Sequence, residues 1–158
     1  MSKKLLSDKF HKEIERIRPR YPTNQALLIP ALHLVQQEFG WVSPEAMDEI
    51  AVAIAINPAV VREVATFYTM FNLKPVGRHH LQFCTNVSCS LLGAEELLEA
   101  TEKQLGISCG ETTKDGKFTI HEVECLGACG TAPCIQVNED YHENLTKERL
   151  AEMLARLE

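Results

Sequence analysis

The sequence has no long uninterrupted hydrophobic stretch. Its longest apolar segment, residues 50–56, is short and rich in alanine, whereas a membrane-spanning helix needs roughly 18 apolar residues. The N-terminal stretch MSKKLLSDKF returns to charged residues after two leucines, so it has no apolar core of a signal peptide. We therefore expect a cytoplasmic protein that does not insert directly into a membrane.

Motifs for nucleotide binding and for nucleophilic catalysis are also missing. The chain contains no Walker A loop, no G-x-G-x-x-G fingerprint and no Ser-His-Asp constellation. We expect no nucleotide or flavin site and no catalytic nucleophile on this chain, and hence no complete active site of its own.

A basic surface is lacking as well. Residues 1–77 hold 9 Lys+Arg against 8 Asp+Glu, and residues 78–158 hold 7 against 14, which together give the net charge of -6. Because neutralisation of phosphates supplies much of the affinity for nucleic acids, this distribution argues against nucleic acid as a partner.

The first half of the chain has the pattern of a small helical bundle. Apolar residues recur at helical spacing, and two segments begin with an N-cap residue followed by proline, at Ser43 and at Asn57. Pro30 lies inside another segment and should kink or divide that helix. We expect a four-helix N-terminal region over residues 1–76, with helices within residues 7–17, 23–40, 43–56 and 57–71.

The pattern changes after residues 74–80, which have the composition of a linker. Strands are expected at residues 79–85 and 117–125, with a helix at 90–106 between them. Residues 134–145 predict a third strand with a turn at Asn138 and a short return, and residues 146–158 predict a closing helix. The order β-α-β-β-α indicates an α+β fold, with a thioredoxin-like domain over residues 77–158.

Six cysteines, all in this second half, are the strongest feature of the sequence. Cys84 and Cys89 form C-x4-C after the first strand, and Cys125 and Cys129 form C-x3-C after the second. In a small sheet, two loops that follow neighbouring strands can lie side by side. Four thiolates would then converge, and such a set suits a 2Fe–2S cluster or a zinc ion.

Other uses of the cysteines are less well matched. Cytoplasmic thiols are kept reduced, which argues against a disulfide framework. A thiol–disulfide enzyme would be expected to carry C-x-x-C, which is missing. Structural zinc is the best rival, although zinc ribbons usually have short C-x2-C knuckles and a whole helix separates the pairs here.

The surroundings of the two pairs suit a negatively charged cluster. The helix expected after Cys89 would direct its N-terminus at the site, and Gly127 and Gly130 would let the loop bring N–H groups close to sulfur. Cys109 and Cys134 are interpreted as small buried or semi-exposed thiols, and Cys134, which opens an apolar strand, as part of the core.

Two longer segments carry a resemblance to a known family. VATFYTMFNLKPVGRHHLQFCTNVSC, followed by ECLGACGTAP, resembles the small 2Fe–2S subunit of bacterial NADH–quinone oxidoreductase, respiratory complex I. LHLVQQEFGWVSPEAMDEIA and DGKFTIHEVECLGACG are also similar to that family, so the resemblance covers nearly the whole chain.

The resemblance implies a thioredoxin-like ferredoxin domain and one 2Fe–2S cluster held by Cys84, Cys89, Cys125 and Cys129. It further implies an electron-transfer role within the oxidoreductase, next to a larger flavoprotein subunit that binds FMN and NADH. The location would be the peripheral arm of an inner-membrane complex. The same motifs occur in subunits of NAD-linked hydrogenases and formate dehydrogenases, and a zinc-stabilised binding module remains the alternative of a different class.

Overall fold

A computed structural model describes residues 5–157 of the chain. Two compact units are present, Met1–Pro75 and Val76–Glu158. Within residues 5–157, no helix combines the length and the hydrophobicity that a transmembrane segment needs.

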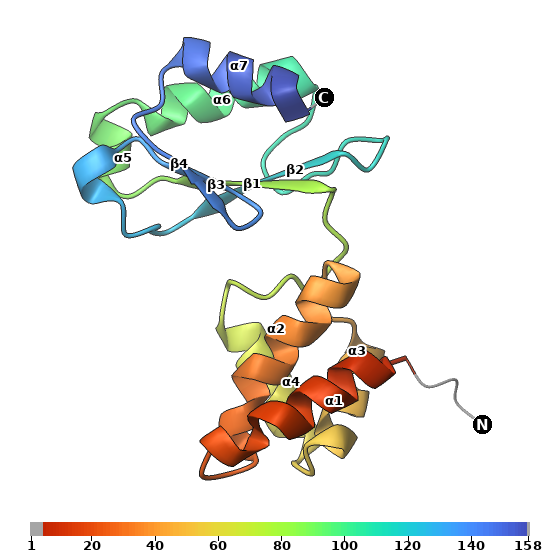
Figure 1. Ribbon diagram of the computed structural model, residues 1–158. Helices are drawn as coiled ribbons and strands as arrows, with labels where there is room; N and C mark the ends of the chain where they lie inside the picture. The colour runs from red at the N-terminus through yellow and green to blue at the C-terminus, as the bar shows by residue number, and fades with distance from the viewer. Residues whose placement is uncertain (1–4, 158) are drawn as a thin grey trace. The chain divides into compact units, whose positions relative to one another are not determined.

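The first unit is helical, as the sequence predicts (Figure 1). Two short 3-10 helices, Arg18–Arg20 and Gln25–Leu27, follow the first α-helix. The four α-helices are α1 (Asp8–Ile17), α2 (Leu28–Phe39), α3 (Pro44–Ala53) and α4 (Pro58–Phe67).

Capping side chains begin three of these helices. Ser43 accepts a hydrogen bond from the backbone N–H of Ala46, and Asn57 accepts one from Ala59. Each cap is followed by proline at the first helical position, where no helical N–H bond is lost. Ser7 caps α1 in the same way. The two cap-plus-proline starts predicted from the sequence are therefore confirmed.

The segment that contains Pro30 is divided into a 3-10 helix and an α-helix, but the division comes before the proline. The segment begins as the 3-10 helix Gln25–Leu27 and becomes α-helical at Leu28. Pro30 therefore lies in the first α-helical turn, where N–H groups have no partner within the helix. Here proline marks the start of the α-helix rather than a break in it.

The four helices enclose one apolar core. Phe10 and Ile14 of α1 face Leu28 and Leu32 of α2 within a single cluster of buried side chains. Ile50 of α3 is fully buried in the same cluster. The first part of the alanine-rich apolar segment at residues 50–56 thus belongs to helix α3, within the helix expected at residues 43–56.

The second unit is a four-stranded mixed sheet with helices. Strand order is β2-β1-β3-β4, in which β1 pairs parallel with β2 and antiparallel with β3, and β3 pairs antiparallel with β4. Its elements are β1 (His79–Cys84), α5 (Val87–Leu91), α6 (Ala94–Leu105), β2 (Phe118–Val123), the 3-10 helix Cys129–Thr131, β3 (Ile135–Val137), β4 (Asp140–His142) and α7 (Lys147–Leu157).

Helices α6 and α7 cover one face of this sheet (Figure 1). Leu81 and Phe83 of β1 point to that face and pack in one cluster with side chains of both helices. Because side chains alternate along a strand, His80, Gln82 and Cys84 point to the opposite face. The buried cluster comprises Leu81, Phe83, Leu97, Leu98, Phe118, Ile120, Ile135, Val137, Leu145, Leu150, Met153 and Leu154.

The α+β, thioredoxin-like architecture is confirmed, with two refinements of the predicted order. The helix expected at residues 90–106 is divided into α5 and α6 at Gly93, whose φ of 92° lies in the left-handed region. The return after the turn at Asn138 pairs with β3 and forms the fourth strand, β4. Helix α7 ends at Leu157, and Glu158 of the predicted helix lies outside the described residues.

One glycine in this unit leaves no room for a side chain. A Cβ on Gly77 would lie 2.8 Å from the backbone carbon of Phe118. We expect Gly77→Ala to lower the free energy of unfolding by about 1–3 kcal/mol, because strand β2 would have to shift. The control is Gly130→Ala, whose Cβ meets no atom within 4 Å. Urea denaturation measures both variants, and an equal effect of the two would contradict the steric explanation.

Candidate metal centre

Parallel pairing of β1 and β2 places the two cysteine-bearing loops at one edge of the sheet. Cys84 is the last residue of β1 and lies opposite Val123, the last residue of β2. The loops that follow are joined directly, because the side-chain amide of Asn86 donates to the carbonyl of Glu124 at 2.8 Å. This is the arrangement that the sequence predicts for loops after neighbouring strands.

The four predicted ligands come together at this edge. The thiols of Cys89 and Cys125 help to lower the pKa of Cys84, and the charge of Cys129 helps to raise the pKa of Cys89, so these side chains lie near one another. Cys84 and Cys89 are buried, whereas Cys125 and Cys129 are exposed. The site therefore has one pair of sulfurs inside the protein and one pair at its surface.

The electrostatics around Cys84 favour a thiolate. Burial raises the pKa of the Cys84 thiol. The N–H groups of Asn86 and Leu126 and the neighbouring thiols lower it by more than burial raises it, so the net shift of the pKa is downward. Burial raises the pKa of Cys89, and the N–H of Cys134 opposes that effect. Metal ions bind the thiolate form, so the N–H groups around Cys84 prepare it as a ligand.

The second loop also directs an N–H group at sulfur. The backbone N–H of Gly127 donates to Cys125 Sγ at 3.3 Å, and the φ of 70° at Gly127 explains the need for glycine there. Gly130 does not have a positive φ and lies in the 3-10 helix Cys129–Thr131. The N–H group expected close to sulfur is found at Gly127, whereas no such contact is seen for Gly130 among the residues that the structure describes.

The helix expected after Cys89 has a different place. Asn86 caps α5 by accepting a hydrogen bond from the N–H of Val87, so the helix starts before Cys89 and contains it. The longer helix α6 starts only at Ala94. A long helix therefore does follow the first pair, but it starts at Ala94 because Gly93 interrupts the segment.

The two remaining cysteines occupy different surroundings. Cys134 is 1% exposed, and its carbonyl accepts the N–H of Cys84 at 3.3 Å. Burial raises the pKa of the Cys134 thiol to about 11, and the charges of Glu143 and of Cys89 add to this shift. Cys109 is exposed beyond the far end of α6, where its N–H donates to Glu102 at 2.7 Å. Cys134 thus adjoins the site, while Cys109 lies away from it.

The donor set fits an iron–sulfur cluster. As they stand among residues 5–157, no three or more His, Cys, Asp or Glu side chains are grouped so that they could hold a metal ion, so the assignment rests on the chemistry of the four cysteines. Four cysteine thiolates are the usual ligands of a 2Fe–2S cluster, which distributes them over two irons. The division into an inner pair, Cys84 and Cys89, and an outer pair, Cys125 and Cys129, is compatible with such a centre.

A histidine pair that was not predicted from the sequence lies on the same sheet. His80 Nε2 and His121 Nδ1 are 2.7 Å apart, on the parallel strands β1 and β2. Burial lowers the pKa of His80 to about 4, with a smaller effect of the charge of His121, and burial also lowers the pKa of His121. The sequence does contain a signal for this pairing, since each histidine lies four residues before the first cysteine of a pair: His80 before Cys84, and His121 before Cys125.

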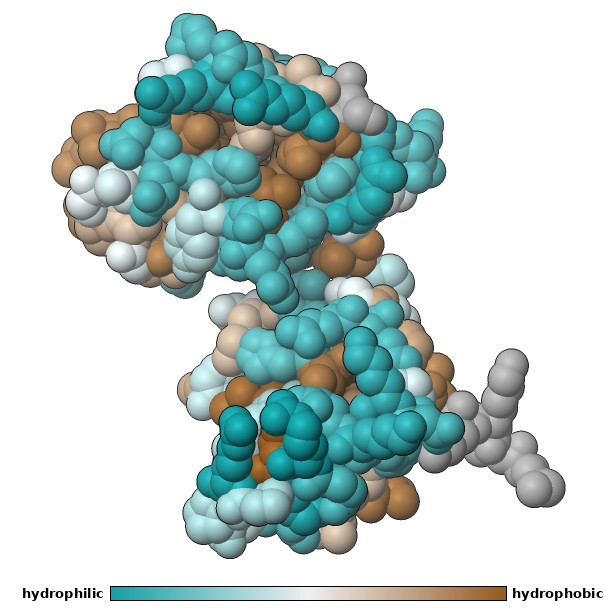
Figure 2. All heavy atoms as spheres, in the orientation of Figure 1, coloured by the Kyte–Doolittle hydropathy of each residue, from teal (hydrophilic) through white to brown (hydrophobic). Residues whose placement is uncertain are grey.

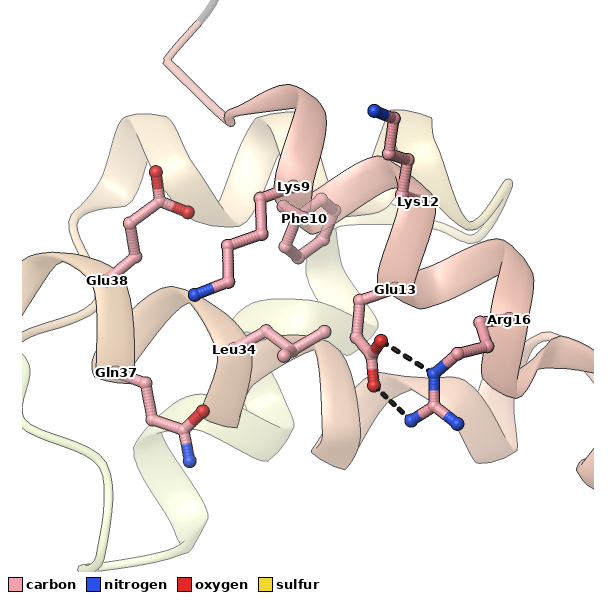
Figure 3. A pocket seen from close by; sticks show the side chains of 8 residues that line it. All are labelled: Lys9, Phe10, Lys12, Glu13, Arg16, Leu34, Gln37 and Glu38. Atoms are coloured by element: carbon pink, nitrogen blue, oxygen red, sulfur yellow. Dashed lines mark hydrogen bonds and ion pairs between the residues drawn. The ribbon is translucent and has the colours of Figure 1, made fainter.

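A groove of about 600 Å³ lies in the helical unit, between α1 and α2 (Figure 3). Its floor includes Phe10 and Leu34, and charged side chains form its rim. Arg16 and Glu13 on that rim are ion-paired to each other along α1. No cysteine lines this groove, so it is separate from the candidate metal centre.

Comparison with known proteins identifies the family. The model of the thioredoxin-like 2Fe-2S ferredoxin family matches residues 14–158. The chain belongs to this family. The resemblance noted in the sequence is thereby confirmed, and with it the ferredoxin character of the fold and the 2Fe–2S cluster as the cofactor of the family.

Individual relatives narrow the comparison. A subunit of the NADH-quinone oxidoreductase of Rhizobium meliloti is 49% identical over 142 residues, which are 90% of this chain and 84% of the relative. NADH-quinone oxidoreductase subunit 2 of Thermus thermophilus is 46% identical, over 91% of this chain and 81% of the relative. A solved NAD+-reducing NiFe hydrogenase has a TM-score of 0.74 at 22% identity, over 83% of this chain and 22% of the hydrogenase chain, and this likeness concerns the fold.

The buried His80 makes stability depend on pH. Because its folded-state pKa is depressed, the unfolded chain binds a proton more readily, and stability is lost as the pH falls below about 6.5. Between pH 7 and pH 5, this group should lower the free energy of unfolding by about 2 kcal/mol.

Urea denaturation at the two pH values measures this effect. We expect His80→Gln to lose less stability than the wild type between pH 7 and pH 5, and the control His142→Gln to behave as the wild type does. A wild-type pH dependence that persists unchanged in His80→Gln would contradict the assignment to His80.

Proposed function

We propose that this chain is the electron-transfer subunit of an NADH–quinone oxidoreductase. It carries one 2Fe–2S cluster and exchanges single electrons with the FMN of a partner flavoprotein subunit, within the peripheral arm of the complex. The convergence of four thiols at one edge of the β1–β2 pair carries this proposal. The names of relatives at 49% and 46% identity support the choice of host complex.

We assign Cys84, Cys89, Cys125 and Cys129 as the cluster ligands. The domain that binds the cluster would be residues 77–158, preceded by a helical region of residues 1–76. When bound, the cluster supplies a one-electron redox couple. The protein holds the inner pair in place through β1 and α5, and the outer pair through the loop after β2.

Backbone N–H groups adjust the charge on the ligand sulfurs. Those of Asn86 and Leu126 face the sulfur of Cys84, and that of Gly127 faces the sulfur of Cys125. Hydrogen bonds to ligand sulfurs stabilise their negative charge and so help to set the reduction potential. The exposed position of Cys125 and Cys129 opens one side of the site to a redox partner.

Exposed apolar side chains lie in and next to α5, the helix that carries one of the four cysteines. Val87, Leu91 and Leu92, in and next to α5, are 65%, 81% and 59% exposed, and α5 also contains Cys89. Figure 2 shows hydrophobic surface gathered at this end of the second unit. Apolar patches of this kind mark contacts with other proteins. We infer that the flavoprotein subunit covers this patch and so approaches the metal centre.

The helical unit offers a second apolar surface. Phe67, Tyr68 and Met70 are 75%, 38% and 43% exposed, whereas Phe71 is buried. Of this aromatic stretch, only Phe71 therefore belongs to the core. The exposed members suit an additional contact with the host complex.

The ligand assignment predicts the effect of removing an outer cysteine. We expect Cys125→Ala and Cys129→Ala to lose the cluster, because the buried cysteines cannot replace a ligand on the exposed side. Iron and acid-labile sulfide per chain are the measurements, and both should fall to background. The matched control Cys109→Ala removes another exposed cysteine and should keep the wild-type iron content.

Retention of wild-type iron and sulfide by Cys125→Ala or Cys129→Ala would overturn the ligand assignment. Zinc without acid-labile sulfide in the wild-type protein would instead favour the zinc-stabilised binding module.

The docking surface has its own test. We expect Leu91→Glu to weaken binding to the purified flavoprotein subunit by about tenfold or more, since a charge would be buried at an apolar contact. Val52→Glu is the matched control, because Val52 is equally exposed, at 81%, but lies on α3. Binding can be measured by calorimetry, with the visible spectrum confirming that the cluster is intact. Equal affinities for the two variants would rule out α5 as the contact.

A further inference from the structure

Cys134 is attached to the inner cysteine pair through its main chain. Its carbonyl accepts the N–H of Cys84 at 3.3 Å, and its own N–H donates to the sulfur of Cys89. The peptide groups on both sides of Cys134 are therefore fixed to the two residues that we assign as inner ligands. This attachment holds the Cα of Cys134 close to the metal centre.

The side chain of Cys134 is on the same side. It packs in a separate buried cluster of small residues, and the charges of Cys89 and Cys84 act on its thiol. The cluster consists of Cys84, Cys89, Ala94, Ala132 and Cys134. Three of these five residues carry sulfur, and the other two are alanines with small side chains.

The thiol of Cys134 is only weakly held. Its hydrogen bond is directed to the carbonyl of Ile135, with a distance of 3.9 Å between sulfur and oxygen. A weak S–H donor at this distance gives little resistance to a change of side-chain rotamer. In addition, removal of the sulfur of Cys89 would leave space within the buried cluster that also contains the side chain of Cys134.

We propose that Cys134 is an alternative ligand of the metal centre, which takes the place of Cys89 when that sulfur is removed or blocked. The inference rests on the proposed function, since it presupposes that the cluster binds at this site. With the sulfur of Cys89 removed or blocked, the thiol of Cys134 would lose its proton to solvent and its thiolate would form the sulfur–iron bond that Cys89 no longer makes. No electron is transferred in the exchange, so no oxidant or reductant is needed.

A pure packing role for Cys134 makes a different prediction. If Cys134 only fills space, loss of Cys89 empties the site whether or not residue 134 carries sulfur. If Cys134 can bind iron, the cluster survives the loss of Cys89 and depends on Cys134 only in that background. The two roles are therefore separated by combining changes at the two positions.

The experiment compares full-length variants purified without oxygen. They are the wild type, Cys134→Ala, Cys89→Ala, Cys89→Ala/Cys134→Ala and the matched control Cys89→Ala/Cys109→Ala. Alanine is used at position 89 because a serine oxygen could itself bind iron. Iron and sulfide content, the visible spectrum and the EPR spectrum after reduction are the readouts, with circular dichroism to check that each variant is folded.

We expect Cys89→Ala to keep most of the iron and to show an EPR signal with g-values shifted from those of the wild type. The Cys89→Ala/Cys134→Ala variant should contain no cluster, whereas Cys89→Ala/Cys109→Ala should match Cys89→Ala. Cys134→Ala alone should resemble the wild type. If the double alanine variant does not fold, Cys89→Ala/Cys134→Val, which restores the lost side-chain volume without a metal-binding atom, replaces it.

A folded Cys89→Ala protein without iron would overturn the proposal. A cluster that persists in Cys89→Ala/Cys134→Ala, or in Cys89→Ala/Cys134→Val, would overturn it as well. A wild-type protein without a cluster would mean instead that the proposed function itself is wrong. The two failures are thereby distinguishable in one set of samples.

Discussion

The parallel pairing of β1 with β2 is the constraint on which the site depends. Parallel neighbours end at the same edge of a sheet, so the loop after Cys84 and the loop that contains Cys125 lie side by side. Antiparallel pairing of the same two strands would place these loops at opposite edges and separate the cysteine pairs. Helix α6 makes the crossover between the two strands possible, and its burial against Leu81 and Phe83 stabilises it.

Much of this arrangement could be predicted from the sequence because the relevant signals are local. The cap-plus-proline starts at Ser43 and Asn57 fix the beginnings of α3 and α4, and alternation of apolar residues fixes the strands. The two cysteine pairs follow those strands directly. Their convergence required one further step, the expectation that neighbouring strands end at the same edge.

The remainder depends on contacts that no local pattern encodes. The interruption at Gly93 places Cys89 inside α5 rather than before a longer helix, because glycine alone adopts that left-handed conformation at little cost. The pairing of His80 with His121 joins residues 41 positions apart, and it follows from strand register. Burial of Cys134 was foreseen from the apolar strand that follows it, but its bonds to Cys84 and Cys89 were not.

The most direct test of the central claim is the metal content and EPR spectrum of the wild-type chain, purified without oxygen and reduced with dithionite. We expect a coloured protein with two irons and two acid-labile sulfides per chain, together with a rhombic EPR signal from one two-iron centre. A colourless protein that contains one zinc ion and no sulfide would leave the fold unchanged, but it would contradict the assignment of an electron-transfer function.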